Sequence, residues 1–390
     1  MSEISNPHIL FISRQPPRQG TGSHIIIERH LKRLEDSNWK ISIVAPENTL
    51  AKVKLPNTWN VISLPKRRWW WPAFRKHLPL SLKIRIHCWE WECKNNLKNT
   101  KISAILADYW DDYSLLAAFL SKKWNIPLSL IIHDQPELWA ASKKQELEIA
   151  KRTKLVINQA QRIWCVSQEL ADAYRLNLNP KTRILLPISN GNFLGLCAEK
   201  QPSNLNKEFV IAHAGSLHPF QYENFKQIAL CLQKINGVFL LIAEQENPTV
   251  KKLQQQFDNI KHYPTFKSNT EVMSFLAKNA HCLLVSYSFD LNQQPWAATS
   301  FPSKLVEFAH LKIPILILAP LNTAISNWAI NNNWLGYVSS LEETELIDIL
   351  NKIKDEETWL KMAKQSTRLA LTKFNPDLIQ AQFQSEIAII

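Results

Sequence analysis

The chain has 390 residues, of which 45% are hydrophobic, and its formal net charge is +12. This length predicts two or three domains, and the hydrophobic content is enough for ordinary globular cores. No apolar run approaches the ~18 residues that a membrane-spanning helix needs, and the N-terminus lacks the charged and apolar regions of a signal peptide. We therefore expect a cytoplasmic protein.

Cysteine usage agrees with this expectation. Cys165 and Cys282 lie inside apolar runs typical of strands, and the sequence has no two CxxC pairs that would make a zinc site. We therefore expect no bound metal.

The first half of the chain alternates predicted strands with predicted helices, the pattern of a parallel α/β sheet. A loop with Gly20 and Gly22 precedes Ser23, which is expected to cap a helix with one apolar side. Together these elements predict a Rossmann-like domain over residues 1–190, followed by a polar linker over 191–207. The strands are expected at residues 8–13, 41–45, 102–107, 126–132, 163–166 and 183–186.

The second half repeats this organisation over residues 208–374. A predicted strand runs into a glycine turn over 209–215, and buried strands follow at 238–243 and 281–287. We therefore expect two doubly wound, Rossmann-like domains. Such domains bind ligands at the carboxyl ends of their strands, so the expected site is the cleft between them.

The segment SFPSKLVEF (300–308) predicts a loop that ends at Pro302 and a helix that starts near Ser303, and the apolar run at 313–318 predicts a buried strand after it. The free N–H groups and positive dipole end of such a helix suit a diphosphate, and Lys304 adds a full charge. Glu307 lies one turn further along the same face, within reach of hydroxyl groups. The segment thus predicts a site for the phosphates and ribose of a nucleotide. The alternative is an amphipathic helix whose Lys304 and Glu307 face solvent.

This segment resembles the donor-site motif of GT-B glycosyltransferases, most closely the PSK…E subgroup of the retaining family 4. The resemblance implies that Lys304 and the helix start meet the diphosphate and that Glu307 accepts from the ribose. It also implies a metal-independent enzyme without a cofactor, whose co-substrate is a UDP- or GDP-linked sugar, and a helix over 375–390 that crosses back to the first domain. Weaker resemblances, in the family's order, are IPLSLIIHDQPE (126–137), RIWCVSQEL (162–170), LLPISNG (185–191) and AHAGSLHPF (212–220).

The chain also departs from the family pattern. Ser300 stands where many members have a second glutamate, and Ser216 and Gln221 stand near the places of an arginine and a lysine. Phosphate charge must then depend more on Lys304 and on backbone N–H groups, including those of the turn at Gly215 and Ser216.

Three catalytic candidates follow predicted strands of the first domain. His133 and Asp134 follow the 126–132 strand, and Asp108 closes the 102–107 strand as a candidate for binding the acceptor. The resemblance places His133 close to the transferred sugar, where imidazole can donate or accept a hydrogen bond. Alternatively, Asp134 caps the next turn and His133 bonds a backbone carbonyl. Asp111 or Asp112 is expected to cap the following helix.

The glycine loop before residue 23 lacks the full GxGxxG pattern, so dinucleotide binding is poorly supported. A short glycine turn before a helix can still approach phosphates or the transferred group closely. We assign that donor-binding role to Gly22 and Ser23.

A basic, tryptophan-rich stretch lies between Glu47 and Glu90, where nine Lys or Arg occur without any Asp or Glu. Interleaved indoles and cations suit the interface of an anionic membrane, which would imply a lipid-linked acceptor. The tryptophans could instead pack inside the domain, and single-stranded nucleic acid is a further option, but no recognised nucleic-acid module is present. The expected membrane-binding residues are Arg67, Arg68, Trp69, Trp70, Trp71, Arg75 and Lys76.

The sequence thus predicts a GT-B hexosyltransferase of polysaccharide biosynthesis that is peripheral on the cytoplasmic face of the membrane. Its expected partners are a nucleotide sugar, a glycan or lipid-linked acceptor and an anionic membrane surface, with no nucleic acid. The alternatives are a nucleotide-sugar epimerase of similar fold and a catalytically silent, membrane-associated binding subunit.

Overall fold

The computed structural model describes residues 6–18, 22–64, 78–98, 100–191, 193, 205 and 208–388. The chain forms two compact units: unit 1 comprises Met1–Leu185 with Gln380–Ile390, and unit 2 comprises Leu186–Ile379. The basic stretch at 66–76, with all seven expected membrane-binding residues, and most of the expected linker at 191–207 lie outside the described residues.

Unit 1 contains a seven-stranded parallel sheet in the order β3-β2-β1-β4-β5-β6-β7. Its strands are β1 His8–Ile12, β2 Lys40–Pro46, β3 Asn60–Leu64, β4 Ala104–Asp108, β5 Leu128–Ile132, β6 Arg162–Cys165 and β7 Thr182–Ile184. Its helices are α1 Gly22–Asp36, α2 Glu47–Leu50, α3 Leu78–Asn96, α4 Asp112–Trp124, α5 Lys143–Gln159, α6 Gln168–Ala173 and the 3₁₀ helix η2 Pro136–Trp139.

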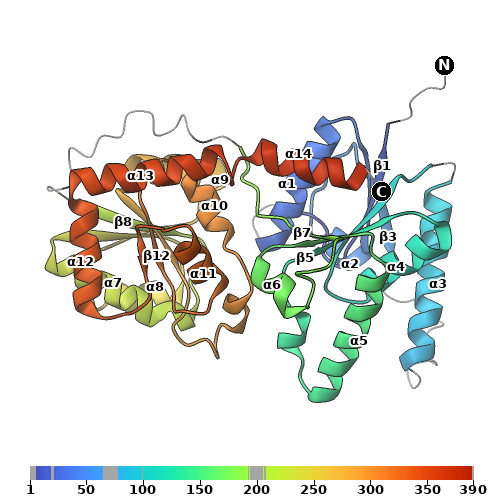
Figure 1. The fold of residues 1–390 in the computed structure, drawn as a ribbon, viewed down its shortest axis with the longest axis horizontal. Coiled ribbons are helices and arrows are strands. Elements are labelled where there is room, and N and C mark those ends of the chain that lie inside the picture. Colours follow the sequence, from blue (N-terminus) through green and yellow to red (C-terminus); the bar gives the residue numbers. More distant parts are fainter. Residues whose placement is uncertain are drawn as a thin grey trace. The chain divides into compact units, whose positions relative to one another are not determined.

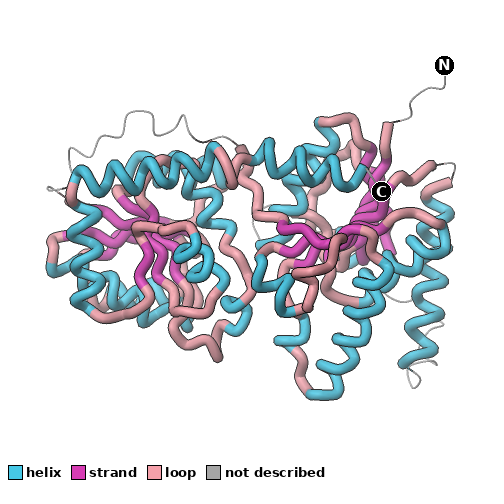
Figure 2. The backbone as a smooth tube through the Cα atoms, viewed as in Figure 1, coloured by secondary structure: helices cyan, strands magenta, loops and turns pink. Residues whose placement is uncertain are grey.

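The central strands of unit 1 are apolar on both faces because helices cover both sides of the sheet (Figures 1 and 2). All five residues of β1, β4 and β5 are buried, and Cys165 is buried at the end of β6. The strands were predicted from these apolar runs. The observed bounds of β1, β4, β5 and β6 differ from the predicted bounds by at most two residues.

The last helix, α14 Pro376–Ala388, supplies part of the core of unit 1. Phe383 is fully buried, with its ring centroid 5.3 Å from that of Trp164 and 4.5 Å from that of His30. Glu386 forms ion pairs with Arg162 at 2.7 Å and with Arg183 at 2.8 Å. Residues from the very end of the chain therefore stabilise the first unit.

Unit 2 contains a six-stranded parallel sheet in the order β10-β9-β8-β11-β12-β13. Its strands are β8 Phe209–Ala214, β9 Gly237–Ile242, β10 Ile260–Tyr263, β11 Cys282–Ser286, β12 Ile315–Leu318 and β13 Tyr337–Val338. Its helices are α7 Tyr222–Lys234, α8 Pro248–Gln254, α9 Asn269–Asn279, α10 Ser303–Ala309, α11 Ala324–Asn331, α12 Glu343–Lys354, α13 Glu356–Leu371 and the 3₁₀ helices η4 Pro219–Gln221 and η5 Pro295–Ala298.

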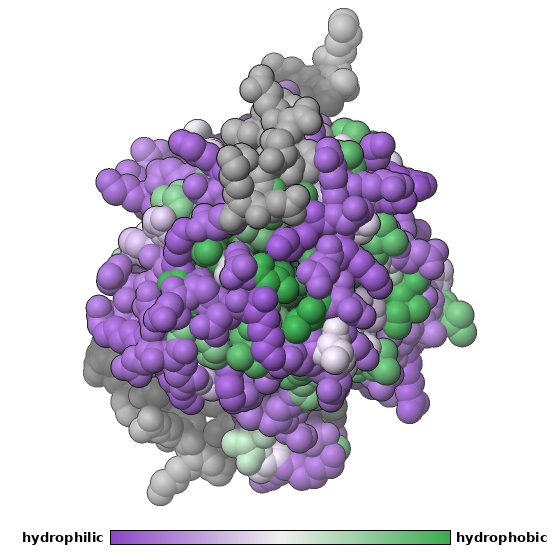
Figure 3. Space-filling model, turned by 90° about the vertical axis from the view of Figure 1, so that its left-hand side faces the viewer, coloured by the Kyte–Doolittle hydropathy of each residue, from purple (hydrophilic) through white to green (hydrophobic). Residues whose placement is uncertain are grey.

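The core of unit 2 is built from four fully buried strands, β8, β9, β11 and β12, with helices on both sides of the sheet (Figure 2). The α12 side of this unit is mainly hydrophilic where it can be seen in Figure 3, and hydrophobic residues form smaller areas within it. Such a surface is typical of a helix-covered parallel sheet, whose apolar side chains point inward.

Three strands were not predicted, namely β3, β10 and β13. All three lie at sheet edges, and each exposes part of its length, so their sequences lack the continuous apolar pattern. The prediction that Ser23 caps the first helix is wrong. Gly22, at φ +42°, begins α1, so Ser23 already lies inside the helix.

None of the helices in the described part of the chain is long and apolar enough to cross a membrane.

Candidate functional site

In unit 2 the strand order reverses between β8 and β11, which pair in parallel at the centre of the sheet. Parallel doubly wound sheets bind ligands beyond the carboxyl ends of the strands at such a switch point. Here β8 ends in a turn at Gly215, whose φ of +115° is a conformation that side-chain-bearing residues rarely adopt.

The Lys304 side chain lies directly against this glycine turn. A Cβ atom built on Gly215 would lie 2.9 Å from Lys304 Cε and 3.0 Å from Nζ, so a larger residue would displace the lysine. Lys304 is the second residue of α10, and its Nζ is 3.0 Å from His213 Nε2. The structure thus places two elements of the predicted donor site, Gly215 and Lys304, in contact.

His213 holds the lysine in place. Its Nδ1 lies 3.0 Å from the carbonyl oxygen of Leu284, which only accepts, so Nδ1 carries the proton and Nε2 accepts from Lys304. The ring is 1% exposed, and burial together with the Lys304 charge lowers the pKa of His213 well below its usual value. The histidine therefore stays neutral and leaves the ammonium charge on the lysine.

Burial lowers the pKa of Lys304 to about 8, against an opposing effect of Glu307. At neutral pH the side chain is still mainly protonated, but its charge has no carboxylate within ion-pair distance among the described residues. A partly desolvated cation at the end of a central strand is a binding element for an anion.

Glu307 lies one turn after Lys304 on α10, and its Oε2 accepts a hydrogen bond of 3.1 Å from Asn269 Nδ2. The predicted helix start near Ser303 is confirmed: Pro302 occupies the N-cap position, without a side-chain hydrogen bond, and Ser303 is the first residue of α10. Ser216 follows the glycine turn and is exposed.

Gln221, near the place of the family's lysine, has a structural role here. Its Nε2 donates to the carbonyl oxygen of Ser286 at 3.1 Å, and its Oε1 accepts from the backbone N–H of His218. Asn224 also donates to Ser286 Oγ, at 2.7 Å. These amides tie the start of α7 to the end of β11 and supply no charge, so Lys304 remains the cation in contact with the turn.

In unit 1 the strand order reverses between β1 and β4, and polar side chains gather at the ends of β4 and β5. Asp108 closes β4 and is only 7% exposed. Burial, and secondarily the charges of Asp111 and Asp134, raises the pKa of Asp108 to about 8. The carboxyl is therefore protonated at neutral pH and can donate a hydrogen bond as well as accept one.

His133 and Asp134 come directly after β5. Burial raises the pKa of Asp134 to about 6, and burial together with His24 and His30 lowers the pKa of His133 to about 3. Among the described residues, His133 Nε2 has no hydrogen-bond partner, and no side-chain cap precedes η2. The capping bond of the first alternative is therefore not observed at η2, and within the described part of the chain Nε2 of His133 does not bond a backbone carbonyl.

His24, in the first turn of α1, lies close enough to His133 to affect its pKa. Burial lowers the pKa values of His24 and His30 to about 4, so all three rings are neutral at pH 7. No group of three or more His, Cys, Asp or Glu side chains in the described part of the chain could hold a metal ion.

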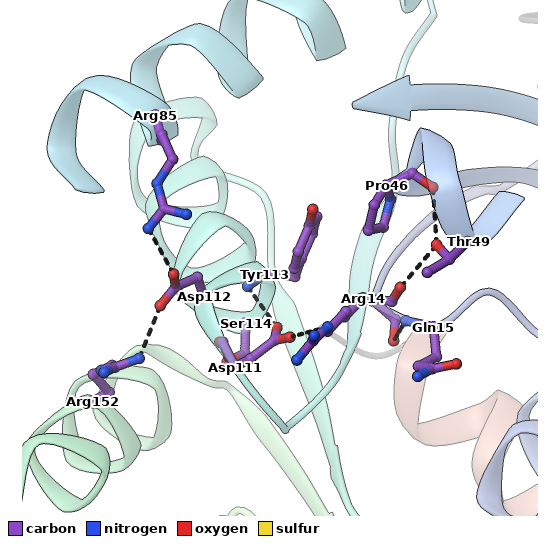
Figure 4. Close-up of polar contacts among 11 residues, drawn as sticks. Arg14, Gln15, Pro46, Thr49, Arg85, Asp111, Asp112, Tyr113, Ser114 and Arg152 are labelled. Atoms are coloured by element: carbon purple, nitrogen blue, oxygen red, sulfur yellow. Dashed lines mark hydrogen bonds and ion pairs between the residues drawn. The ribbon is translucent and has the colours of Figure 1, made fainter. Parts of the chain in front are cut away.

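Asp111 and Asp112 have structural roles, as Figure 4 shows. Asp111 caps α4 by accepting from the Tyr113 N–H at 3.0 Å, which confirms one of the two predicted caps, and it lies 3.6 Å from Arg14 Nε. Asp112 accepts from Arg85 of α3 at 2.8 Å and from Arg152 of α5 at 2.9 Å. This carboxylate joins three helices, which leaves Asp108 and Asp134 as the carboxyls free of such roles.

Two residues of the unit 2 site were not predicted. His213 is the penultimate residue of β8. The available signal was a single polar residue in an otherwise apolar strand, two positions before Gly215. Asn269 gave none, because the first residue of α9 reaches Glu307 only through the fold.

The sequence matches no protein-family model and no curated protein. Solved structures do match over nearly the whole chain. HepE of Anabaena, in complex with UDP and glucose, is 17% identical with a TM-score of 0.67, covering 99% of this chain and 100% of that one. A glycosyltransferase of Rickettsia africae is 15% identical with a TM-score of 0.66, covering 98% of both chains.

The α,α-trehalose-phosphate synthase (UDP-forming) of Burkholderia xenovorans, in complex with glucose-6-phosphate, is 10% identical with a TM-score of 0.60. The match covers 98% of this chain and 100% of that one. At these identities the likeness defines the fold. The chain has the GT-B fold of two Rossmann-like units, as the sequence predicts.

Proposed function

We propose that this protein is a glycosyltransferase that moves a sugar from a nucleotide sugar to a hydroxyl group of an acceptor. The observation that carries the proposal is the Lys304 ammonium group, which is oriented by His213 and lies against the Gly215 turn at the switch point of unit 2. A fixed cation beside a side-chain-free turn suits a diphosphate, because the backbone leaves room for phosphate oxygens.

The family resemblance suggests the roles of the further residues. Lys304 stabilises the charge that develops on the departing diphosphate, and Glu307, positioned by Asn269, accepts from the ribose hydroxyls. In unit 1, His133 bonds a hydroxyl of the transferred sugar, and Gly22 and Ser23 approach the donor. Asp108 and Asp134 bind the acceptor. The family resemblance adds a retaining, metal-independent reaction.

The donor base is proposed to be uracil, with guanine as the alternative. The support comes from HepE, which was solved with UDP and glucose, and from the UDP-forming synthase, since both have the same fold. The proposed contact of Lys304 does not distinguish the two bases, because the diphosphate is common to both.

A transfer assay tests the proposal. The full chain is incubated with UDP- and GDP-linked sugars, with and without a panel of glycans and lipid-linked saccharides, and the products are separated. We expect nucleoside diphosphate and a glycosylated acceptor only when both substrates are present. An altered sugar formed without acceptor would establish an epimerase, and the absence of turnover despite nucleotide binding would establish a silent subunit.

We further propose that the acceptor is lipid-linked and belongs to polysaccharide biosynthesis. The protein would be cytoplasmic and would reach this acceptor by binding the membrane surface through its basic tryptophan stretch at 66–76. Because electrostatic attraction to anionic lipid falls off within a Debye length of ~8–10 Å, the protein should co-sediment with anionic vesicles and be released by salt. Glutamine at Arg67, Arg68, Arg75 and Lys76 should abolish sedimentation. The charge-matched control replaces four exposed α5 lysines: Lys143, Lys144, Lys151 and Lys154. Equal sedimentation of the two variants would contradict the proposal.

A further inference from the structure

Two exposed indoles lie where the loops of unit 1 leave the central strands. Trp110 follows β4 by two residues and is 38% exposed, and Trp139 ends η2, just after β5, and is 46% exposed. Their ring centroids are 5.2 Å apart and their planes are inclined by 55°. Because β4 and β5 are parallel neighbours, both tryptophans follow the carboxyl ends of these strands, where Asp108 and Asp134 also lie.

Exposure of this kind is unusual for tryptophan in this protein. Among the described tryptophans, the exposed ones are Trp91, Trp110 and Trp139, and of these Trp110 and Trp139 pack against each other. A large aromatic surface left in water is unfavourable, at roughly 25 cal/mol per Å² of apolar area, so a paired and exposed set is typical of a binding surface.

The polar groups beside the indoles indicate what they bind. Asp108 is more than nine-tenths buried, and in the part of the chain that the structure describes no hydrogen bond or ion pair engages its carboxyl or that of Asp134. Neither carboxyl is among the fully enclosed unpartnered groups of the described residues, so water can reach both. These two carboxyls and Asp111 lie close enough to influence one another electrostatically. Such carboxyls can exchange water for the hydroxyl groups of a ligand.

A saccharide satisfies both requirements. One face of a sugar ring carries C–H groups that pack on an aromatic surface, and its edge carries hydroxyls that donate to carboxyl oxygens. An anionic ligand fits worse, because the nearby acidic groups repel it and Arg14 is already paired with Asp111. A lipid chain would leave the carboxyls unpartnered.

We propose that Trp110 and Trp139 form a stacking platform for an uncharged sugar ring of the acceptor, with Asp108 and Asp134 as hydrogen-bond partners of its hydroxyls. The proposal rests on the proposed transferase function and adds the acceptor's chemical class. The acceptor end would be a neutral saccharide, whatever carrier is attached to it.

Binding to immobilised neutral mono- to tetrasaccharides tests the platform without requiring turnover. The full chain is compared with Trp110→Ala and Trp139→Ala, with the conservative Trp110→Phe and Trp139→Phe, and with Trp91→Ala as an exposed indole elsewhere. We expect at least a tenfold loss of saccharide affinity in each alanine variant, about threefold or less in the phenylalanine variants, and no change in Trp91→Ala.

A second measurement uses the unaltered protein, so it does not depend on the variants folding. Tryptophans are oxidised with N-bromosuccinimide with and without the retained saccharide and are quantified by peptide mass spectrometry. The saccharide should slow oxidation of Trp110 and Trp139 at least threefold relative to Trp91. The platform would be overturned if the saccharide changed the oxidation rates of Trp110 and Trp139 no more than that of Trp91.

Nucleoside-diphosphate titration of the same samples separates this inference from the proposed function. A chain that binds nucleotide but retains no saccharide, or retains it equally in the alanine variants, overturns the platform alone. Selective loss of vesicle binding in the alanine variants would make the surface a lipid site and would also overturn it. A chain that binds saccharide through the two indoles but binds no nucleotide supports the platform and contradicts the transferase.

Discussion

Replacing Lys304 by alanine is expected to weaken nucleoside-diphosphate binding by about 10- to 150-fold, since a charged hydrogen bond contributes ~1.5–3 kcal/mol. The fold should survive, because the substitution removes a partly desolvated cation whose pKa is already lowered to about 8. Isothermal titration with UDP and GDP measures the loss. Lys278→Ala, at an exposed position of α9, is the matched control and should bind as the parent does.

The same titration has a pH dependence that identifies the lysine. With a pKa of about 8, Lys304 loses its charge as the pH rises from 7 to 9, so the affinity of the parent should fall over this interval. Lys304→Ala should show a flat profile at the lower affinity. A parent whose affinity is independent of pH, or a folded Lys304→Ala variant with unchanged affinity, would remove the diphosphate role from this residue.

Asp108→Asn is expected to stabilise the protein at neutral and higher pH while weakening acceptor binding. The folded-state pKa of about 8 lies above the ordinary value of 3.8. The stabilising contribution of Asp108 is therefore complete below about pH 3.8, declines above it and is lost as the pH passes 8. An amide of the same size avoids this cost, which approaches about 5 kcal/mol at pH 7.5 for these two pKa values, so the free energy of unfolding should rise by several kcal/mol.

Urea unfolding at pH 5 and pH 7.5 measures this effect. The difference in the free energy of unfolding between Asp108→Asn and the parent should be smaller at pH 5. At this pH the carboxyl of the unfolded chain is closer to its own pKa, so its ionisation stabilises the unfolded state less. Asp36→Asn, at an exposed position at the end of α1, should leave the stability unchanged at both pH values. An Asp108→Asn variant that is less stable at pH 7.5 would show that the carboxyl is needed for packing rather than for a ligand.

Local sequence patterns were sufficient to predict the central strands and to narrow the cap of α4 to Asp111 or Asp112. Buried parallel strands are continuous apolar runs, and a short acidic residue before an apolar helix is a strong cap signal. The pairing of Lys304 and Glu307 on one helix face was also predictable, because three-residue spacing is a local property of helices.

The contacts that orient the unit 2 site were not predictable in this way. His213 and Lys304 are 91 positions apart, and Asn269 and Glu307 are 38 apart, so each pair depends on the assembled sheet. The edge strands β3, β10 and β13 were missed because they lack a continuous apolar run, and the start of α1 was misplaced because Gly22 rather than a capping side chain precedes Ser23. The Trp110–Trp139 pair likewise forms only when β4 and β5 align.

If unit 2 holds a nucleoside diphosphate at the Gly215 turn and the start of α10, the ligand should protect backbone amides there. Amide hydrogen exchange of the full chain, with and without saturating UDP or GDP, measures this protection directly. We expect slower exchange at residues 213–217 and 303–307, because the phosphates cover these backbone groups. Protection confined to unit 1, or no protection in unit 2 under saturating nucleotide, would contradict binding at this site.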